Sequence, residues 1–73
     1  EAAAEASIRE ALNAALKHLS SRAQEILRLR FGLDREAQTL AVIAAQLRLS
    51  SERVRQIEAQ ALRELTRHLA GER

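Results

Sequence analysis

One segment, residues 39–65, constrains the fold most, because its apolar residues recur at helical spacing on both sides of a short turn. Before the turn, Leu40, Ile43 and Leu47 recur every three or four residues, and the small Ala44 allows a second helix to cross closely. After the turn the same spacing returns in a longer set: Val54, Ile57, Ala61 and Leu65. Two helices joined in this way are typical of a helix-turn-helix.

Polar capping residues mark where these two helices begin. Thr39 and Ser50 each stand directly before an apolar repeat, where a hydroxyl accepts a hydrogen bond from the first helical turn. The second helix is predicted to run to about Leu69, with Gly71 as its stop. We expect the helix-turn-helix to span about residues 39–66.

The N-terminal part of the chain predicts one amphipathic helix that ends near His18. Its apolar residues recur as the core-facing side of a helix requires: Ile8, Leu12, Leu16 and Leu19. Residues 1–6, Glu-Ala-Ala-Ala-Glu-Ala, have strong helix propensity and no large apolar side chain. We interpret them either as a native helix start or as a rigid helical spacer.

A further helix follows, with Ser20 or Ser21 as its cap. Gly32 is expected to end it, because glycine readily adopts the left-handed conformation found at helix ends. A polar loop at 33–38 then leads to the helix-turn-helix. The expected inward side chains of this helix are Ala23, Ile26, Leu27 and Phe31. The sequence thus predicts a single compact all-α domain over residues 1–73, with four helices including a helix-turn-helix.

Composition excludes several classes of protein. A chain of 73 residues can build one small core, and without cysteine it has neither disulfides nor a thiolate metal site. His18 and His68 have no partner at the sequence spacing of metal ligands, so we expect no metal and no cofactor. No apolar run approaches the ~20 residues that span a bilayer, and no signal peptide is evident. We expect a cytoplasmic protein without a membrane partner.

The serines do not indicate an enzyme. They stand at helix starts, and no histidine, cysteine or carboxylate pair stands at a spacing that would activate them. They are better interpreted as caps than as nucleophiles: Ser20, Ser21, Ser50 and Ser51.

The charged residues are distributed unevenly, although the net charge is only +2. Residues 1–18 carry two basic and three acidic side chains, whereas residues 19–69 carry nine basic and six acidic ones. On the last helix, the face opposite the apolar repeat carries polar side chains that suit base edges and phosphates: Glu52, Gln56 and Arg63, with Arg55 on the flank. The placement of charge favours DNA binding at the helix-turn-helix end.

The order of several motifs resembles one family. Leu19-Ser-Ser-Arg22, Ile26-Leu-Arg-Leu-Arg-Phe-Gly-Leu33, Thr39-Leu40, Glu52-Arg-Val-Arg-Gln-Ile-Glu-Ala59 and Ala61-Leu-Arg63 are similar to region 4, the C-terminal domain, of sigma-70 family initiation factors of bacterial RNA polymerase. The resemblance covers about residues 7–66. It implies recognition of the promoter −35 element in double-stranded DNA and binding to the flap of the polymerase β subunit.

The resemblance also implies roles for individual residues. Base edges in the major groove would be faced by Ser51, Glu52, Arg55 and Gln56, and phosphates by Arg22, Arg30 and Arg53. Transcription activators would meet Gln60 and Arg63, and an anti-sigma factor is a further partner of such domains. A core of this size should leave some apolar side chains partly exposed in a groove for the flap: Leu29, Leu33, Val42 and Leu69. The protein would then be associated with the nucleoid.

Some positions depart from the principal members of the family. Ser51 stands where arginine is usual, which removes one cation from the base-contacting end. Gln60 stands where lysine is common, and Ala41 and Val42 replace an acidic pair. We therefore interpret the chain as an alternative sigma factor, or as a fragment of a larger one.

Two other functions compete with this interpretation. The output domain of response-regulator activators also begins with a segment like that of residues 19–27, but the motifs at 30–33 and 52–56 favour a sigma factor. A protein-interaction module that binds a partner helix in a groove is the second alternative.

Overall fold

The computed structural model describes the backbone of residues 2–71 and the side chains of residues 8–71. Its helices are α1 (Ala2–Leu16), α2 (Ser21–Phe31), α3 (Leu40–Leu47) and α4 (Ser51–Leu69), and no strand occurs in this described part. The predicted all-α fold with a helix-turn-helix is confirmed. Residue 1 lies outside the described residues, and residues 2–6 are helical, as both interpretations of that segment predict.

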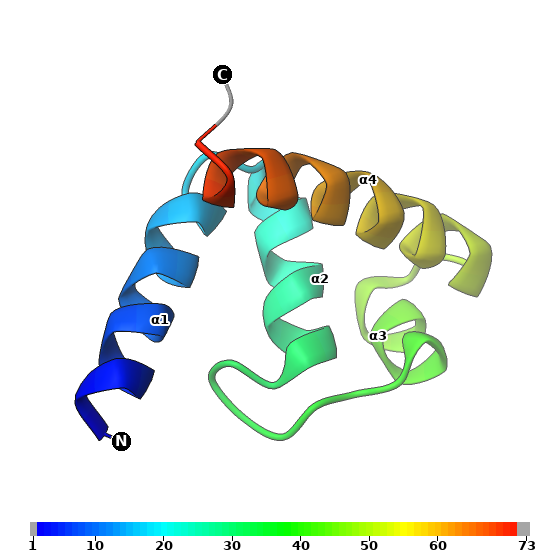
Figure 1. Ribbon diagram of the computed structural model, residues 1–73. Helices are drawn as coiled ribbons and strands as arrows, with labels where there is room; N and C mark the ends of the chain where they lie inside the picture. The colour runs from blue at the N-terminus through cyan, green and yellow to red at the C-terminus, as the bar shows by residue number, and fades with distance from the viewer. Residues whose placement is uncertain (1, 72–73) are drawn as a thin grey trace.

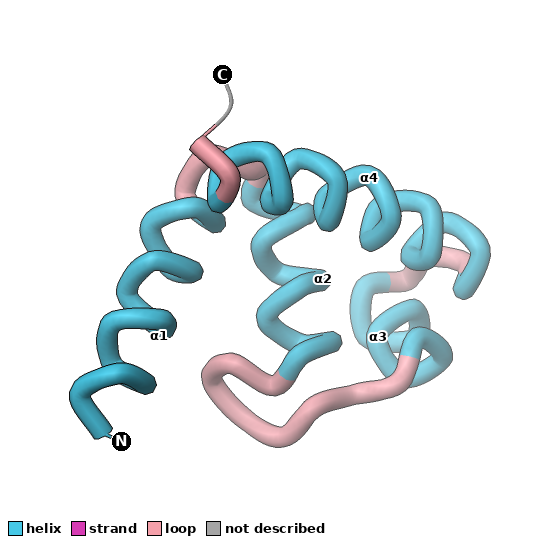
Figure 2. The backbone as a smooth tube through the Cα atoms, viewed as in Figure 1, coloured by secondary structure: helices cyan, strands magenta, loops and turns pink. Residues whose placement is uncertain are grey.

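Helix α4 holds the other helices together (Figure 1). It runs from beside α3, across the start of α2, to the C-terminal end of α1, and it packs against all three. Figure 2 shows the long loop that returns from the end of α2 to α3. Within residues 2–71, no helix is both long and apolar enough to cross a membrane.

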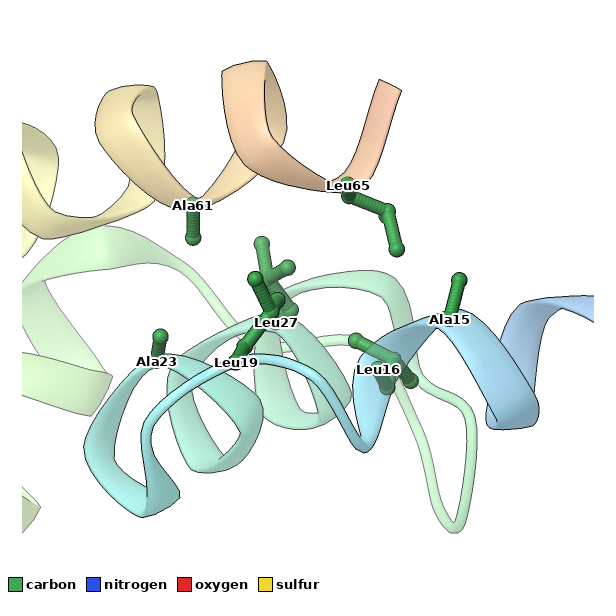
Figure 3. Close-up of a cluster of buried hydrophobic side chains, with 7 residues drawn as sticks. All are labelled: Ala15, Leu16, Leu19, Ala23, Leu27, Ala61 and Leu65. Atoms are coloured by element: carbon green, nitrogen blue, oxygen red, sulfur yellow. The ribbon is translucent and has the colours of Figure 1, made fainter. Parts of the chain in front are cut away.

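The core consists of two clusters that meet at the partly buried Ile57. The first joins α1, α2 and α4 (Figure 3): Ala15, Leu16, Leu19, Ala23, Leu27, Ala61 and Leu65. The second joins α2, α3 and α4: Ile26, Leu29, Ile43, Ala44 and Val54. The neighbours Ile26 and Leu27 enter different clusters, so α2 is buried on two sides and is the central helix.

This central position corrects two predictions on α2. Leu29, predicted to be partly exposed, is only 8% exposed, because it lies on the side of α2 that packs in the α3 cluster. Phe31, predicted to be inward, is 51% exposed. It follows Leu27 by one turn on the same side of α2, but it lies at the last residue of the helix, in a surface groove beside α1.

Hydroxyl caps start the helices as predicted. Ser20 Oγ accepts from the Ala23 amide at 3.1 Å, which selects Ser20 over Ser21 as the cap of α2. Thr39 Oγ1 accepts from Val42 N at 3.2 Å, and Ser50 Oγ caps α4 in the same way. Each such cap contributes about 1 kcal/mol.

Two residues in the left-handed conformation end α2 and α3. Gly32, with φ +65°, ends α2 as predicted, and a Cβ there would lie 2.7 Å from Ala37 N. Arg48, with φ +60°, ends α3. A side chain in this conformation costs about 1 kcal/mol, and no glycine signal in the sequence predicted the position. Arg48 thereby sets the turn between the two helices of the helix-turn-helix.

The two histidines lie against each other, a contact that the sequence analysis did not predict. Their rings stack with centroids 4.3 Å apart and planes inclined by 13°. His18 follows α1 and His68 lies in the last turn of α4. No local pattern could indicate this stack, because fifty residues of sequence separate two helix ends that the fold brings together.

Candidate nucleic-acid interface

The N-terminal part of α4 presents a polar surface at the end of the molecule opposite α1 (Figure 1). Val54 is fully buried between α2, α3 and α4, and this contact fixes the rotation of α4 about its own axis. The residues that the sequence predicts to contact bases all lie outside the core and are exposed: Ser51, Glu52, Arg55 and Gln56.

Three of these side chains form a hydrogen-bonded group. The Glu52 carboxylate accepts from Arg55 Nε at 2.9 Å and from Arg55 Nη2 at 2.6 Å. Gln56 Nε2 donates to the same carboxylate at 3.4 Å. The bidentate hydrogen bond from Arg55 lowers the pKa of Glu52 below its usual value, and the carboxylate in turn raises the pKa of Arg55.

Two of the predicted phosphate-contacting arginines lie on the same side of the domain. Arg22 of α2 and Arg53 of α4 line one shallow surface depression. Arg22 has an exposed partner, Glu25, at 3.6 Å, and an exposed pair of this kind holds its arginine only weakly. Both arginines are therefore accessible to an anion.

Arg30, the third predicted phosphate contact, is engaged within the protein. Its Nε donates to Glu58 Oε2 at 3.0 Å and its Nη1 to the Gln38 carbonyl oxygen at 3.4 Å. It thereby connects α2, the loop and α4. The sequence analysis missed this role, because no spacing relates Arg30 to a residue 28 positions away; the phosphate contact stays a prediction.

The residues expected to face activators lie farther along α4. Gln60 donates to Glu64 at 3.4 Å, and Arg63 is exposed. Gln60 lines the depression shared by Arg22 and Arg53, whereas Arg63 lines a different hollow with Leu62 and Thr66. Both remain available to a partner.

The four residues predicted to line the flap groove do not share one groove. Leu29 is buried, Val42 is exposed on α3, and Leu69 is exposed at the end of α4. Of the four, only Leu33 lines the groove between α1 and the end of α2, whose polar lining residues are Arg9, Asn13, Arg28 and Asp34. Its apolar neighbours there, which the sequence analysis did not assign to the flap, are Ile8, Leu12 and Phe31.

This fold and its exposed polar helix end define a helix-turn-helix domain of the DNA-binding class. Residues 15–67 match the family Sigma-70, region 4, and the chain belongs to that family. The resemblance that the motifs indicated is therefore confirmed. The family match favours a sigma factor over the output domain of a response-regulator activator.

Curated relatives agree with this assignment. RNA polymerase sigma factor SigA4 of Synechococcus elongatus is 51% identical over 57 residues, which cover 77% of this chain and 18% of that protein. RNA polymerase sigma factor SigA of Clostridium acetobutylicum is 46% identical over 66 residues, or 89% of this chain and 18% of that protein. The chain thus spans less than a fifth of the length of these relatives.

Proposed function

We propose that this chain recognises the promoter −35 element and binds the β flap of RNA polymerase, as part of a sigma factor in transcription initiation. The observation that carries the DNA-binding part is the orientation of α4. The buried Val54 turns Glu52, Arg55 and Gln56 outward at the start of the second helix of the helix-turn-helix, where such proteins meet the major groove.

The exposed side chains suit base recognition. Arginine can donate two hydrogen bonds to guanine O6 and N7, and glutamine can pair with adenine N6 and N7, each contributing ~1–3 kcal/mol of discrimination. Arg22 and Arg53 would neutralise phosphates beside the groove, which sets the register of the domain on the duplex. Ser51 adds a hydroxyl and no charge at this end of α4.

The groove between α1 and the end of α2, in which apolar side chains lie beside polar ones, is the surface that best suits a flap helix. Phe31 and Ile8 are largely exposed along it, and Leu12 and Leu33 form its floor. An amphipathic helix can lay its apolar face in such a groove. The proposed flap contact therefore differs from the four residues predicted from the sequence, and Leu33 is the one residue common to both. Val42 and Leu69 are then outside the flap contact.

The remaining parts of the proposal follow from the same role. An initiation factor that binds promoter DNA works in the cytoplasm at the nucleoid. Gln60 and Arg63 form a surface for activators on α4, between its base-contacting start and its C-terminal end. An anti-sigma factor is a further partner in this proposal.

Selection of bound sequences from a random duplex pool tests the DNA-binding part. We expect wild type to select a defined site, and Arg55→Ala to weaken binding by ~1–3 kcal/mol and relax preference at one base pair. Arg67→Ala is the matched control, because it removes the same charge near the other end of α4. If Arg55→Ala selects the same sequences as wild type, the proposed base contact is wrong.

A titration of labelled protein with a flap-tip peptide tests the polymerase contact. Backbone amide shifts should cluster around Phe31 and Leu33 and leave Glu52 to Gln56 unchanged. Phe31→Ser should weaken binding of the peptide. Leu69→Ser changes a side chain that is equally exposed but lies outside the groove, and it should leave peptide binding unchanged. A spectrum unchanged at high peptide excess would contradict the flap proposal.

A further inference from the structure

Arg48 carries the only charge in a long uncharged stretch of the sequence. Residues 37–51 form α3, the turn and the start of α4, and every other side chain among them is neutral. Arg48 is exposed, and none of the ion pairs among residues 8–71 involves it. Its guanidinium is therefore available to a partner outside the domain.

The backbone conformation at Arg48 is one that favours glycine. Arg48 has φ +60° and ψ +42°, and among residues 2–71 it is the only residue other than glycine with a positive φ. The Leu49 amide donates to the Ala44 carbonyl oxygen at 2.9 Å, and this bond closes the left-handed end of α3 around Arg48. Glycine would adopt the same conformation without the steric cost of a Cβ. The turn thus requires the conformation but not the arginine side chain.

The turn lies beside the surface proposed to contact DNA. Figure 2 shows it at the start of α4, and Arg48 precedes Ser50, the cap of α4, by two residues. Ser51 adds no charge at this end of the helix. Phosphates flank the groove that receives the start of such a helix. A long arginine side chain on the turn is suited to reach one of them.

We propose that Arg48 binds a DNA phosphate from the turn of the helix-turn-helix. This inference rests on the proposed DNA-binding function. A phosphate contact adds affinity that falls with salt and fixes the register of the domain on the duplex, but it does not distinguish bases. The strained backbone position of Arg48 then serves binding, because the fold would accept glycine there.

Removal of the side chain should act differently on folding and on binding. Arg48→Gly relieves the strain at positive φ, so the midpoint of thermal unfolding should stay the same or rise. The affinity for the selected duplex should fall about 3- to 10-fold, and the slope of log affinity against log salt concentration should decrease by about 1. A scrambled duplex should lose affinity by the same factor. Fluorescence anisotropy across a salt series measures all three quantities of binding.

Matched variants isolate the charge from the strain. Arg48→Lys keeps both the charge and the strained backbone, and it should retain most of the affinity. Arg48→Gln keeps the strain without the charge, and it should bind as weakly as Arg48→Gly. Arg67→Ala removes an arginine from the last turn of α4, and it should bind DNA like wild type.

The results separate this inference from its alternatives. Affinity and salt slope unchanged in Arg48→Gly would show that no phosphate is bound. A lower unfolding midpoint in the same variant would then assign the charge to the carbonyl groups at the end of α3, which a cation stabilises. A loss of affinity confined to the selected duplex would mean that Arg48 contacts a base, and the phosphate contact would be wrong. The proposed function fails separately, if wild type selects no sequence from the random pool.

Discussion

Arg30 on α2 donates from Nε to Glu58 Oε2 on α4 at 3.0 Å. The side chain of Glu58 is only 14% exposed, and Arg30 also donates to the Gln38 carbonyl oxygen. One guanidinium therefore connects the central helix, the long loop and the helix proposed to contact DNA. A single substitution can test how much of the fold depends on this connection.

Arg30→Ala should lower the free energy of unfolding by about 1–2 kcal/mol, because it leaves the largely buried Glu58 carboxylate without its charged donor. Arg22→Ala is the control. Its pair with Glu25 is exposed on both sides, so its loss should cost less than ~0.5 kcal/mol. Urea unfolding followed by circular dichroism measures both, and equal effects would show that the Arg30 connection does not stabilise the fold.

A second prediction compares two apolar residues one turn apart on α2. Leu27→Ala should cost about 2–5 kcal/mol, because Leu27 is 1% exposed within the α1, α2 and α4 cluster. Phe31→Ala should cost less than ~1 kcal/mol, since half of that side chain is already in water. Thermal unfolding of both variants measures the two losses of stability. A larger loss for Phe31→Ala than for Leu27→Ala would mean that Phe31 belongs to the core.

Glycine substitutions should separate backbone strain from steric clash. Gly32 and Gly71 both have positive φ, so alanine strains the backbone at either position by about 1–2 kcal/mol. Only at Gly32 would the added Cβ meet backbone atoms, at 2.7 Å from Ala37 N. Gly32→Ala should therefore be clearly less stable than Gly71→Ala in chemical denaturation, and equal stabilities would argue against the close approach of the loop.

The ion pair at the start of α4 predicts a pH dependence. Arg55 lowers the pKa of Glu52 from its ordinary value of 4.5 in the folded protein. The pair should therefore stabilise the fold above about pH 4.5, and this contribution should be lost as the pH falls through the lower folded pKa. An NMR titration of the Glu52 side-chain carboxyl should give a low pKa in wild type and a value near 4.5 in Arg55→Ala. An unshifted value in wild type would mean that the pair does not persist in solution.

The affinity for DNA should be low in the isolated domain and should fall as salt rises. Few arginines can reach phosphates, so the isolated domain should bind its site weakly and lose binding as salt rises. Arg53→Ala should weaken binding to all DNA sequences alike and reduce the slope of log affinity against log salt concentration by about 1. Arg67→Ala should leave that slope nearly unchanged. Fluorescence anisotropy across a salt series measures this. Tethering to polymerase should restore occupancy; nanomolar specific binding by the free domain at physiological salt would indicate a self-sufficient repressor instead.

The sequence by itself determined the elements of this protein. Helical spacing and hydroxyl caps located the helices, since both act within a few residues along the chain. Thr39 and Ser50 start the two helices of the helix-turn-helix, and Gly32 ends α2, as predicted. The outward placement of Glu52 and Gln56 also followed from the sequence, because residues a turn apart on one helix share a face whatever packs behind them.

The tertiary structure alone decided which side chains meet across the fold. Leu29 and Phe31 are both apolar residues at helical spacing, and only the positions of α3 and α1 make one buried and the other exposed. Arg30 with Glu58 and His18 with His68 are far apart in sequence, so no local pattern relates them. Burial and long-range pairing depend on how α4 crosses the other three helices, and that crossing is set by the packing of both clusters together.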